Sequence, residues 1–502
     1  MALIAVQTVG RTLVAAHTGL GDVEAYYWTW SQALAGGYLD HGPVVAVLIR
    51  AGTALGGDRA WIVRLPFILC SAATLAVAAV VARRMASGVA GASLLACGAV
   101  LAMPMFTLAG GAANPDVPLG LWTVLLLALL VGRPLGVRRA MCAGLLVGLA
   151  ISTKLLGLLL APWVLRRAWI AARRWPTLAA TVSGMLLGAL PPLVWNATHG
   201  WVSLRYHFVL RHSRPAGPSW ENAAKLIAGQ LGYVSPFVLV ALLLLAVALW
   251  RERASVEAID PAADVLWAAL PALIGGWALI LLIPSAEPHW PAFGYLPLAC
   301  ALGRVWPQWH AARPRALRRW TGAALAWSAL IALVLHLHVL TDLGVRTMPS
   351  AYVARYDLSN ELRGWPAVAE AVAVALRRGS AARPGRTVLV AGCHYTSCAQ
   401  LRFAATGRFP VVCPSPRLDQ FDLAGDGDGS RRRGVDLLYV EDERFPYPAA
   451  TLYRCAGIVA EDAVEIRRAG RKVRRFALQW CLGFAGLKAQ HWPPRPDTLA
   501  VR

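Results

Sequence analysis

The sequence predicts a mainly α-helical, polytopic membrane protein: residues 1–341 form a multi-span core, and residues 342–502 form an α/β domain outside the cytoplasm. The composition is the first reason, because 57% of the 502 residues are hydrophobic and only 15% are charged. In soluble domains about 45–50% of the residues are apolar and about 25% are charged. The second reason is the spacing of apolar runs. Stretches near the roughly 17–25 residues that cross a bilayer recur up to residue 341 and are absent beyond it.

These apolar runs predict about eleven helices, of which the shorter ones are expected to be tilted or partly re-entrant. The first run carries Gln7 and Arg11 and is the weakest, and it has no signal-peptide cleavage pattern before Asp22. The predicted spans cover residues 2–18, 60–82, 87–107, 117–132, 139–153, 155–166, 176–195, 231–250, 265–284, 290–303 and 319–341.

The net charge of +22 comes largely from arginine clusters that lie between apolar runs. Such clusters mark cytoplasmic loops, so this pattern argues against a nucleic-acid partner. The clusters fall in alternate loops, which puts the N-terminus in the cytoplasm and the C-terminus outside. Most acidic residues of the core then lie on the outer side. The clusters occupy residues 83–84, 133–139, 166–174, 251–253 and 304–319.

Beyond Asp342 the apolar runs shorten to strand length. Residues 386–393 and 434–442 are typical of buried strands, and residues 364–379 of an amphipathic helix. Residues 463–480 predict a hairpin that turns at Ala469-Gly470. The loop 422–434 has an incomplete calcium-loop pattern and is interpreted as a solvated loop.

Five of the nine cysteines lie in this domain, where an oxidising periplasm permits disulfides. Because five is odd, at least one of them stays free or pairs elsewhere. Cys393 and Cys398 are close enough in sequence to bridge if the chain turns between them, and a straight strand would keep them apart. The other three are Cys413, Cys455 and Cys481.

Six motifs follow one another along the core. They are EAYYWTWSQALAGGYLDHGP (24–43), RAWIVRLP (59–66), NPDVPLGLWTVLLLAL (114–129), STKLLGLLLAPWVL (152–165), PPLVWNATHGWVSLRYHF (191–208) and EPHWPAFGYLPL (287–298). In this order they resemble the bacterial branch of glycosyltransferase family 39, which is related to the protein O-mannosyltransferases and the aminoarabinose lipid A transferase. The resemblance implies a GT-C fold with outward-facing catalytic loops. It also implies inverting transfer of a sugar from a polyprenyl-phosphate donor.

The chain departs from the family pattern at two positions. Val23 precedes Glu24 where the family has an acidic residue or glutamine, and Asp22 lies one place earlier. Gly42 replaces a proline after Asp40-His41, and we expect it to loosen that turn, since glycine does not fix φ.

Inverting transfer needs a carboxylate that accepts the proton of the attacking hydroxyl. The predicted catalytic residues are therefore Glu24, which matches the family best, together with Asp22 and Asp116. Asp116 has an alternative role as the N-cap of the following helix. The sequence requires no cofactor. The carboxylates on the outer side could nevertheless bind a divalent cation, so metal dependence stays open.

The substrate-binding candidates supply positive charge for a leaving phosphate and aromatic faces for a sugar. Tyr26, Tyr27 and Trp28 either stack on a sugar or form an interfacial belt. Lys154 either binds phosphate or extends its ammonium to the membrane surface. The remaining candidates are Asp40, His41, Arg64, His199, Arg205, His289 and Trp290.

Two other functions stay open. A transporter or lipid flippase would also be polytopic, although no internal repeat is visible here. An inactive homologue that only binds ligand is compatible with Val23 and Gly42. The favoured prediction is an enzyme of the bacterial inner membrane with its active site facing the periplasm. Its partners would be a polyprenyl-phosphate-linked sugar, membrane lipids, and a lipid, glycan or protein acceptor.

Overall fold

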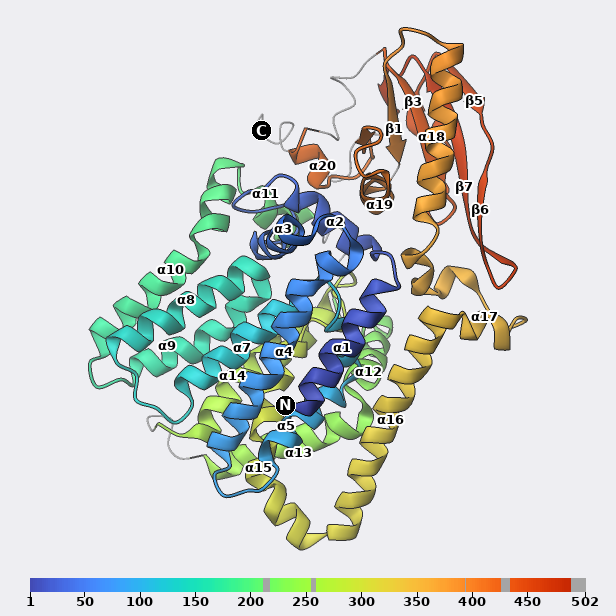
Figure 1. The fold of residues 1–502 in the computed structure, drawn as a ribbon. Coiled ribbons are helices and arrows are strands. Elements are labelled where there is room, and N and C mark those ends of the chain that lie inside the picture. Colours follow the sequence, from blue (N-terminus) through green and yellow to red (C-terminus); the bar gives the residue numbers. More distant parts are fainter. Residues whose placement is uncertain (211–216, 254–258, 393, 426–433, 489–502) are drawn as a thin grey trace. The chain divides into compact units, whose positions relative to one another are not determined.

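The computed structural model describes residues 1–210, 217–253, 259–392, 394–425 and 434–488, and its helices dominate the fold (Figure 1). The chain forms two compact units. We call Met1–Leu13, His41–Leu48 and Arg64–Leu335 the helical unit, and Val14–Asp40, Ile49–Val63 and the chain from His336 onward the mixed unit. The mixed unit thus contains two early segments as well as the C-terminal region. A single boundary at residue 341, as predicted from the sequence, would place those early segments in the membrane core.

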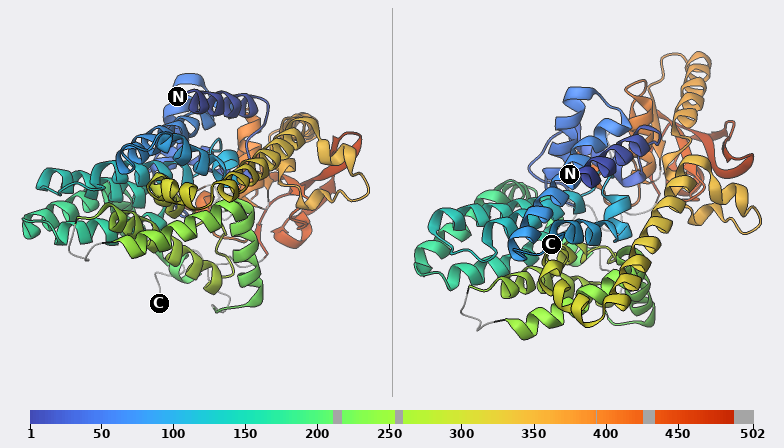
Figure 2. Two further views of the ribbon diagram at one scale, coloured as in Figure 1. Left: turned by 90° about the horizontal axis from the view of Figure 1, so that it is seen from below. Right: turned by 60° about the horizontal axis from the view of Figure 1, so that its bottom comes forward.

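The apolar runs of the helical unit fold into a bundle of helices, seen from two more directions in Figure 2. The helices that lie wholly or partly in this unit are α1 (Ala2–Ala16), α3 (Val44–Gly56), α4 (Ala60–Met85), α5 (Ala92–Leu101), α6 (Pro104–Ala109), α7 (Asp116–Leu130), α8 (Val137–Thr153), α9 (Ala161–Trp169), α10 (Arg174–Thr198), α11 (Val202–Arg205), α12 (Trp220–Val234), α13 (Pro236–Glu252), α14 (Pro261–Leu282), α15 (Tyr295–Ala312) and α16 (Pro314–Thr341). Three short helices complete it: 3-10 turns at Leu155–Leu160 and Ala292–Gly294, and a π-helix at Tyr206–Leu210.

Within the described residues, four helices are long and apolar enough to cross a membrane by length and composition: α4, α10, α14 and α16. The pair α12 and α13, bent by 98° at Ser235, is a fifth candidate. Shorter apolar helices, among them α1, α5 and α7, accompany them. The protein is therefore a multi-pass membrane protein, and the total of eleven spans stays a prediction.

Two predicted spans are interrupted in the structure, and α3 was not among the predictions. The run at 87–107 divides into α5 and α6, because Pro104 starts a new helix and has no N–H for the preceding one. The run at 231–250 covers the last four residues of α12 and then α13, which begins at Pro236 after Ser235 adopts a positive φ of 75°.

Glycines bring α8 and α10 into backbone contact. A Cβ on Gly144 would lie 2.0 Å from the carbonyl oxygen of Thr181, and a Cβ on Gly148 would lie 2.4 Å from that of Met185. Small residues allow such close approach between membrane helices. The pairing fixes the C-terminal end of α8, where Lys154 follows.

Gly42 also serves a close approach, and the expectation that it loosens the turn after His41 stays a prediction. A Cβ at this position would lie 2.0 Å from the carbonyl oxygen of Ser152, near the end of α8. The absent side chain therefore lets the chain after His41 pack directly on the segment that carries Lys154.

The mixed unit contains a sheet of strand order β2-β1-β3-β7-β5, with β6 paired to β7. Strands β1 and β3 are parallel and β3 and β7 antiparallel, with Leu438 opposite Trp480. The strands are β1 (Val388–Gly392), β2 (Val411–Val412), β3 (Asp436–Asp442), β5 (Gly457–Ala460), β6 (Val464–Arg468) and β7 (Arg471–Leu482), and the pair β4 (Tyr453–Arg454) and β8 (Gly486–Leu487) lies apart from this sheet.

Helices accompany the sheet. They are α2 (Asp22–Ser31), α17 (Leu343–Thr347), α18 (Trp365–Ala382), α19 (Tyr395–Ala405), α20 (Gln420–Leu423) and α21 (Ala449–Leu452), with 3-10 turns at Ala354–Tyr356 and Leu358–Leu362.

The local predictions for the C-terminal region are confirmed. The two strands and the helix lie where the sequence pattern put them, as β1, β3 and α18. The hairpin β6–β7 turns at Ala469 and Gly470, both with positive φ. Most of the loop 422–434 lies outside the described residues.

Cys455 and Cys481 form a disulfide with a Cα–Cα distance of 5.3 Å. The Sγ atoms of Cys398 and Cys413, both buried, are 2.7 Å apart. Cys393 lies outside the described residues, so its pairing with Cys398 stays a prediction.

Candidate active site

A partly buried ion pair joins two predicted site residues of the helical unit. Asp116 is the first residue of α7, and Lys154 lies in extended conformation directly after α8. The Nζ of Lys154 is 2.7 Å from Oδ1 of Asp116. Removing both charges from water is costly, so such pairs inside a membrane protein commonly mark functional positions.

The N-cap role considered for Asp116 is not what the structure has. The side-chain Oδ1 of Asn114 accepts hydrogen bonds from the backbone N–H groups of Asp116 and Val117, at 3.0 and 3.3 Å. Asn114, one residue before the N-cap position at Pro115, therefore satisfies the first two N–H groups of α7. The carboxylate of Asp116 is left for Lys154.

His289 and Trp290, from the loop before α15, complete a group that we call the Asp116 cluster. The Nε2 of His289 lies 3.5 Å from Oδ2 of Asp116. The ammonium of Lys154 lies 6.0 Å from the centroid of the Trp290 ring. The side chain of His289 is 32% exposed, against 17% for Asp116, so the cluster opens to its surroundings on the histidine side.

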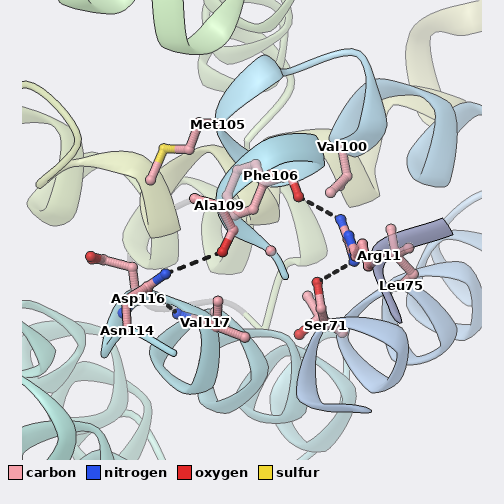
Figure 3. A pocket seen from close by; sticks show the side chains of 13 residues that line it. Arg11, Ser71, Leu75, Val100, Met105, Phe106, Ala109, Asn114, Asp116 and Val117 are labelled. Carbon is pink, nitrogen blue, oxygen red and sulfur yellow. Dashed lines mark hydrogen bonds between the residues drawn. The ribbon is translucent and has the colours of Figure 1, made fainter. Parts of the chain in front are cut away.

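A small cavity of about 30 Å³ adjoins Asp116, between α1, α4, α6 and α7 (Figure 3). A volume of that size accommodates a few water molecules, but it is too small for a sugar. Arg11 lines it and is buried, with its guanidinium bonded to the hydroxyl of Ser71 and the carbonyl of Phe106. From the sequence, Arg11 is only a residue that makes the first predicted span less apolar. An arginine within an apolar run also indicates that this side chain faces the interior of the helix bundle.

The contacts of the other predicted residues of the helical unit are as follows. The ring of His41 stacks on that of His207 at 6.4 Å, beside the π-helix, a rare element that is frequent at functional sites. His199, the residue directly after α10, stacks on Trp195 of that helix at 4.4 Å. Arg64 is buried in α4, and Arg205 ends α11.

In the mixed unit, Glu24 lies in the first turn of α2 and is 7% exposed. Its Oε2 accepts a hydrogen bond of 2.7 Å from the backbone N–H of Gly21, which is one half of a capping box. This bond stabilises the start of the helix and fixes the position of the carboxylate.

The aromatic residues of α2 are buried within the mixed unit. The ring of Tyr26 packs against Tyr395 of α19, 4.5 Å between centroids, and its hydroxyl accepts a hydrogen bond from the backbone of Gln420. Trp28 donates a hydrogen bond of 2.7 Å to Asp58. Tyr27 is buried as well. In the structure these rings pack inside the unit, and sugar stacking by Tyr26, Tyr27 and Trp28 stays a prediction.

Asp22 also lies in α2, and its partners come from the C-terminal region. Its Oδ2 is 2.8 Å from a guanidinium nitrogen of Arg444, and its Oδ1 accepts a hydrogen bond of 3.1 Å from Gln400. No local pattern in the sequence indicates these partners. Asp40, eighteen residues farther along than Asp22, belongs to the same unit.

The carboxylates do not form a metal centre in the part of the chain that the structure describes. Within those residues, no group of three or more histidine, cysteine, aspartate or glutamate side chains is arranged to hold a metal ion. In the Asp116 cluster, an ammonium is the counter-ion of the carboxylate.

Comparisons with known proteins agree with this architecture. A family model described as dolichyl-phosphate-mannose-protein mannosyltransferase matches residues 40–195. A lipid A galacturonosyltransferase, RgtD of Rhizobium johnstonii, is 29% identical over 289 residues. That match covers 54% of this chain and 58% of the relative, so the chain spans less than two thirds of that protein's length.

Two solved structures share the fold over nearly the whole chain. The crystal structure of ArnT from Cupriavidus metallidurans bound to undecaprenyl phosphate has a TM-score of 0.60 at 18% identity, and covers 95% of this chain and 97% of that one. Its apo state gives 0.58 at 16% identity, with the same coverage.

The fold class is therefore the ArnT-like GT-C fold, mostly helical with a small C-terminal sheet-containing domain. The resemblance to glycosyltransferase family 39 predicted from the six motifs is confirmed.

Proposed function

We propose that this protein is an inverting glycosyltransferase that moves a sugar from a polyprenyl-phosphate donor to a lipid acceptor. The Asp116 cluster is the observation that carries this proposal, because a buried ammonium beside an imidazole and an indole suits a lipid-linked phosphate. The fold of a protein crystallised with undecaprenyl phosphate, and a relative named as a lipid A galacturonosyltransferase, support it.

In the proposed reaction, the acceptor hydroxyl oxygen forms a bond to the anomeric carbon as the bond from that carbon to the phosphate oxygen breaks. Glu24 accepts the hydroxyl proton as general base. The polyprenyl phosphate leaves as an anion, and Lys154 stabilises that charge. Asp116 holds Lys154 in place before the phosphate binds.

The remaining predicted contacts keep their roles as proposals. His289 and Trp290 flank the phosphate from the side of the Asp116 cluster, and His41 lies beside the π-helix. Asp40, Arg64, His199 and Arg205 stay substrate-binding candidates.

The proposed setting is the bacterial inner membrane, with the active site facing the periplasm. The alternating arginine clusters support this orientation. A tag at Arg313, between α15 and α16, should be protected from reagents added outside cells, and a tag after Arg502 should be accessible. The opposite labelling would overturn the orientation.

Donor binding tests the phosphate site. Mass spectrometry of lipids that co-purify with the protein should detect polyprenyl phosphate, and Lys154→Ala should retain at least about tenfold less of it. Arg84→Ala is the matched control, because it also removes one positive charge from the helical unit at an exposed position. Equal retention by both variants would contradict the role of Lys154.

Transfer is tested in vesicles that contain a labelled polyprenyl-phosphate sugar and an amphipathic glycolipid acceptor. The proposal expects label on the acceptor. Label that crosses the bilayer while still attached to the polyprenyl carrier, with none on the acceptor, would identify a flippase instead.

A further inference from the structure

The chain segment just ahead of Glu24 is fastened at several points. Within residues 19–24, the carbonyl of Leu20 accepts a hydrogen bond of 2.8 Å from the side chain of Gln400 in α19. The same amide nitrogen donates to Asp22. Gly19 packs so closely under the carbonyl of Leu362 that a Cβ would lie 2.5 Å from its oxygen. Helix α19 and the turn at Leu358–Leu362 therefore hold this segment.

Arg444 is the charged centre of these contacts. Its guanidinium lies 2.8 Å from Asp22, 3.5 Å from Glu361 and 3.0 Å from Asp442. Glu361 in turn accepts a hydrogen bond of 3.3 Å from the backbone N–H of Asp22. A planar guanidinium can satisfy three carboxylates in fixed directions, which the single ammonium of a lysine does less well.

The sheet fixes the direction of Arg444 itself. Asp442 is the last residue of β3 and is fully buried, and its Oδ1 accepts a hydrogen bond of 3.1 Å from the backbone N–H of Arg444. Arg474 of β7 and Ser397 of α19 bond to the same carboxylate. Burial alone would favour the neutral acid, but the charges of Arg474 and Arg444 lower the pKa of Asp442 to about 2.

We propose that Arg444 is a positioning residue that holds Asp22, and through it the start of α2 with Glu24, in a fixed place on the C-terminal sheet. The proposal rests on the proposed function, in which Glu24 is the general base. A base must lie within hydrogen-bond reach of its proton, and a displacement of about 1 Å can cost about 10²-fold in rate. Asp22 then acts through Arg444 and not as a catalytic residue.

Hydrogen exchange measured by mass spectrometry on the full-length protein tests the positioning without reference to activity. In Arg444→Gln, the backbone N–H groups of Gly21 and Asp22 should exchange at least about tenfold faster than in the wild type, because their segment opens locally. Arg386→Gln is the matched control, since Arg386 pairs with Asp436 at the same sheet at 2.9 Å. Equal protection of residues 19–24 in both variants would overturn the proposal.

Kinetics test whether this position matters for the reaction. Arg444→Gln should lower kcat by about 10²-fold with little change in KM, and Arg444→Lys should restore part of it. The double variant Asp22→Asn/Arg444→Gln should be no slower than Arg444→Gln, because both changes break one contact. Additive losses would instead make Asp22 a separate catalytic group and overturn the assignment.

Two further results separate this proposal from the proposed function. If Arg444→Gln fails to fold, Gln400→Leu tests the same positioning at a neutral contact, and unchanged exchange in residues 19–24 would contradict it. If Glu24→Gln turns over normally, the general-base role of Glu24 in the proposed function fails. Faster exchange in Arg444→Gln would still support the fixation of α2 by the sheet.

Discussion

The Asp116 cluster of the helical unit and the charged network of the mixed unit, which contains Asp22, Arg444, Asp442 and Arg474, differ at their central carboxylates. In the network, Asp442 has no exposed surface and accepts bonds from two arginines and a serine. In the cluster, Asp116 keeps 17% of its side chain exposed and faces one lysine and one half-buried histidine. Saturated charges hold a structure together, whereas incompletely surrounded ones remain available to a ligand.

The largest stability effect is expected in the network. Arg474→Gln removes one of the two guanidinium groups that pair with Asp442 and leaves a buried carboxylate undercompensated, which typically costs about 3–5 kcal/mol. Chemical denaturation followed by tryptophan fluorescence measures this loss of unfolding free energy. Arg386→Gln at a half-exposed pair should cost much less, because solvent screens that pair. Similar costs for the two variants would contradict the saturation of the network.

The Asp116 cluster should respond in the opposite way. Lys154→Ala should cost less stability than Arg474→Gln, about 1–3 kcal/mol, because the partly exposed Asp116 can take up water or a proton. Its main consequence should be the loss of bound polyprenyl phosphate. A variant that unfolds as readily as Arg474→Gln while it keeps the lipid would reverse the comparison.

A smaller effect concerns pH. Burial and then the charge of Asp22 raise the pKa of Glu361 to about 7, above its ordinary value of 4.5. The folded state therefore binds the proton more tightly than the unfolded state, so this contribution to stability is complete below pH 4.5 and is lost as the pH rises through about 7. The melting temperature of the wild type should fall between pH 5 and pH 8. Glu361→Gln should flatten that slope, and an unchanged slope in this variant would exclude Glu361 as its source.

Sequence patterns predicted the parts of the fold whose signal is local. The turn at Ala469-Gly470 needs two residues that tolerate positive φ, and β1 and β3 are short apolar runs bounded by glycine and proline. The sequence motifs also predicted Asp116, Lys154 and His289 as site residues, and these three lie together in the structure.

Contacts between distant segments could not be predicted in this way. Arg444 and Gln400 are more than 370 residues from Asp22, and only the arrangement of α2, α19 and the end of β3 brings them together. The aromatic side chains of α2 suggested an exposed surface, because nothing in the sequence indicates that α19 covers them. The disulfide partner of Cys455 could not be predicted either. Cys481 lies in β7, and only the pairing of β5 with β7 brings it close to Cys455.

The turnover of Glu24→Gln tests the central claim most directly. The substitution keeps the shape of the side chain and removes the charge, so transfer from a polyprenyl-phosphate sugar should fall by about 10²–10⁴-fold. The variant should still retain its donor lipid, because the proposed phosphate site contains Lys154 and not Glu24. Transfer at the wild-type rate by a folded, donor-loaded Glu24→Gln protein would contradict the proposed mechanism.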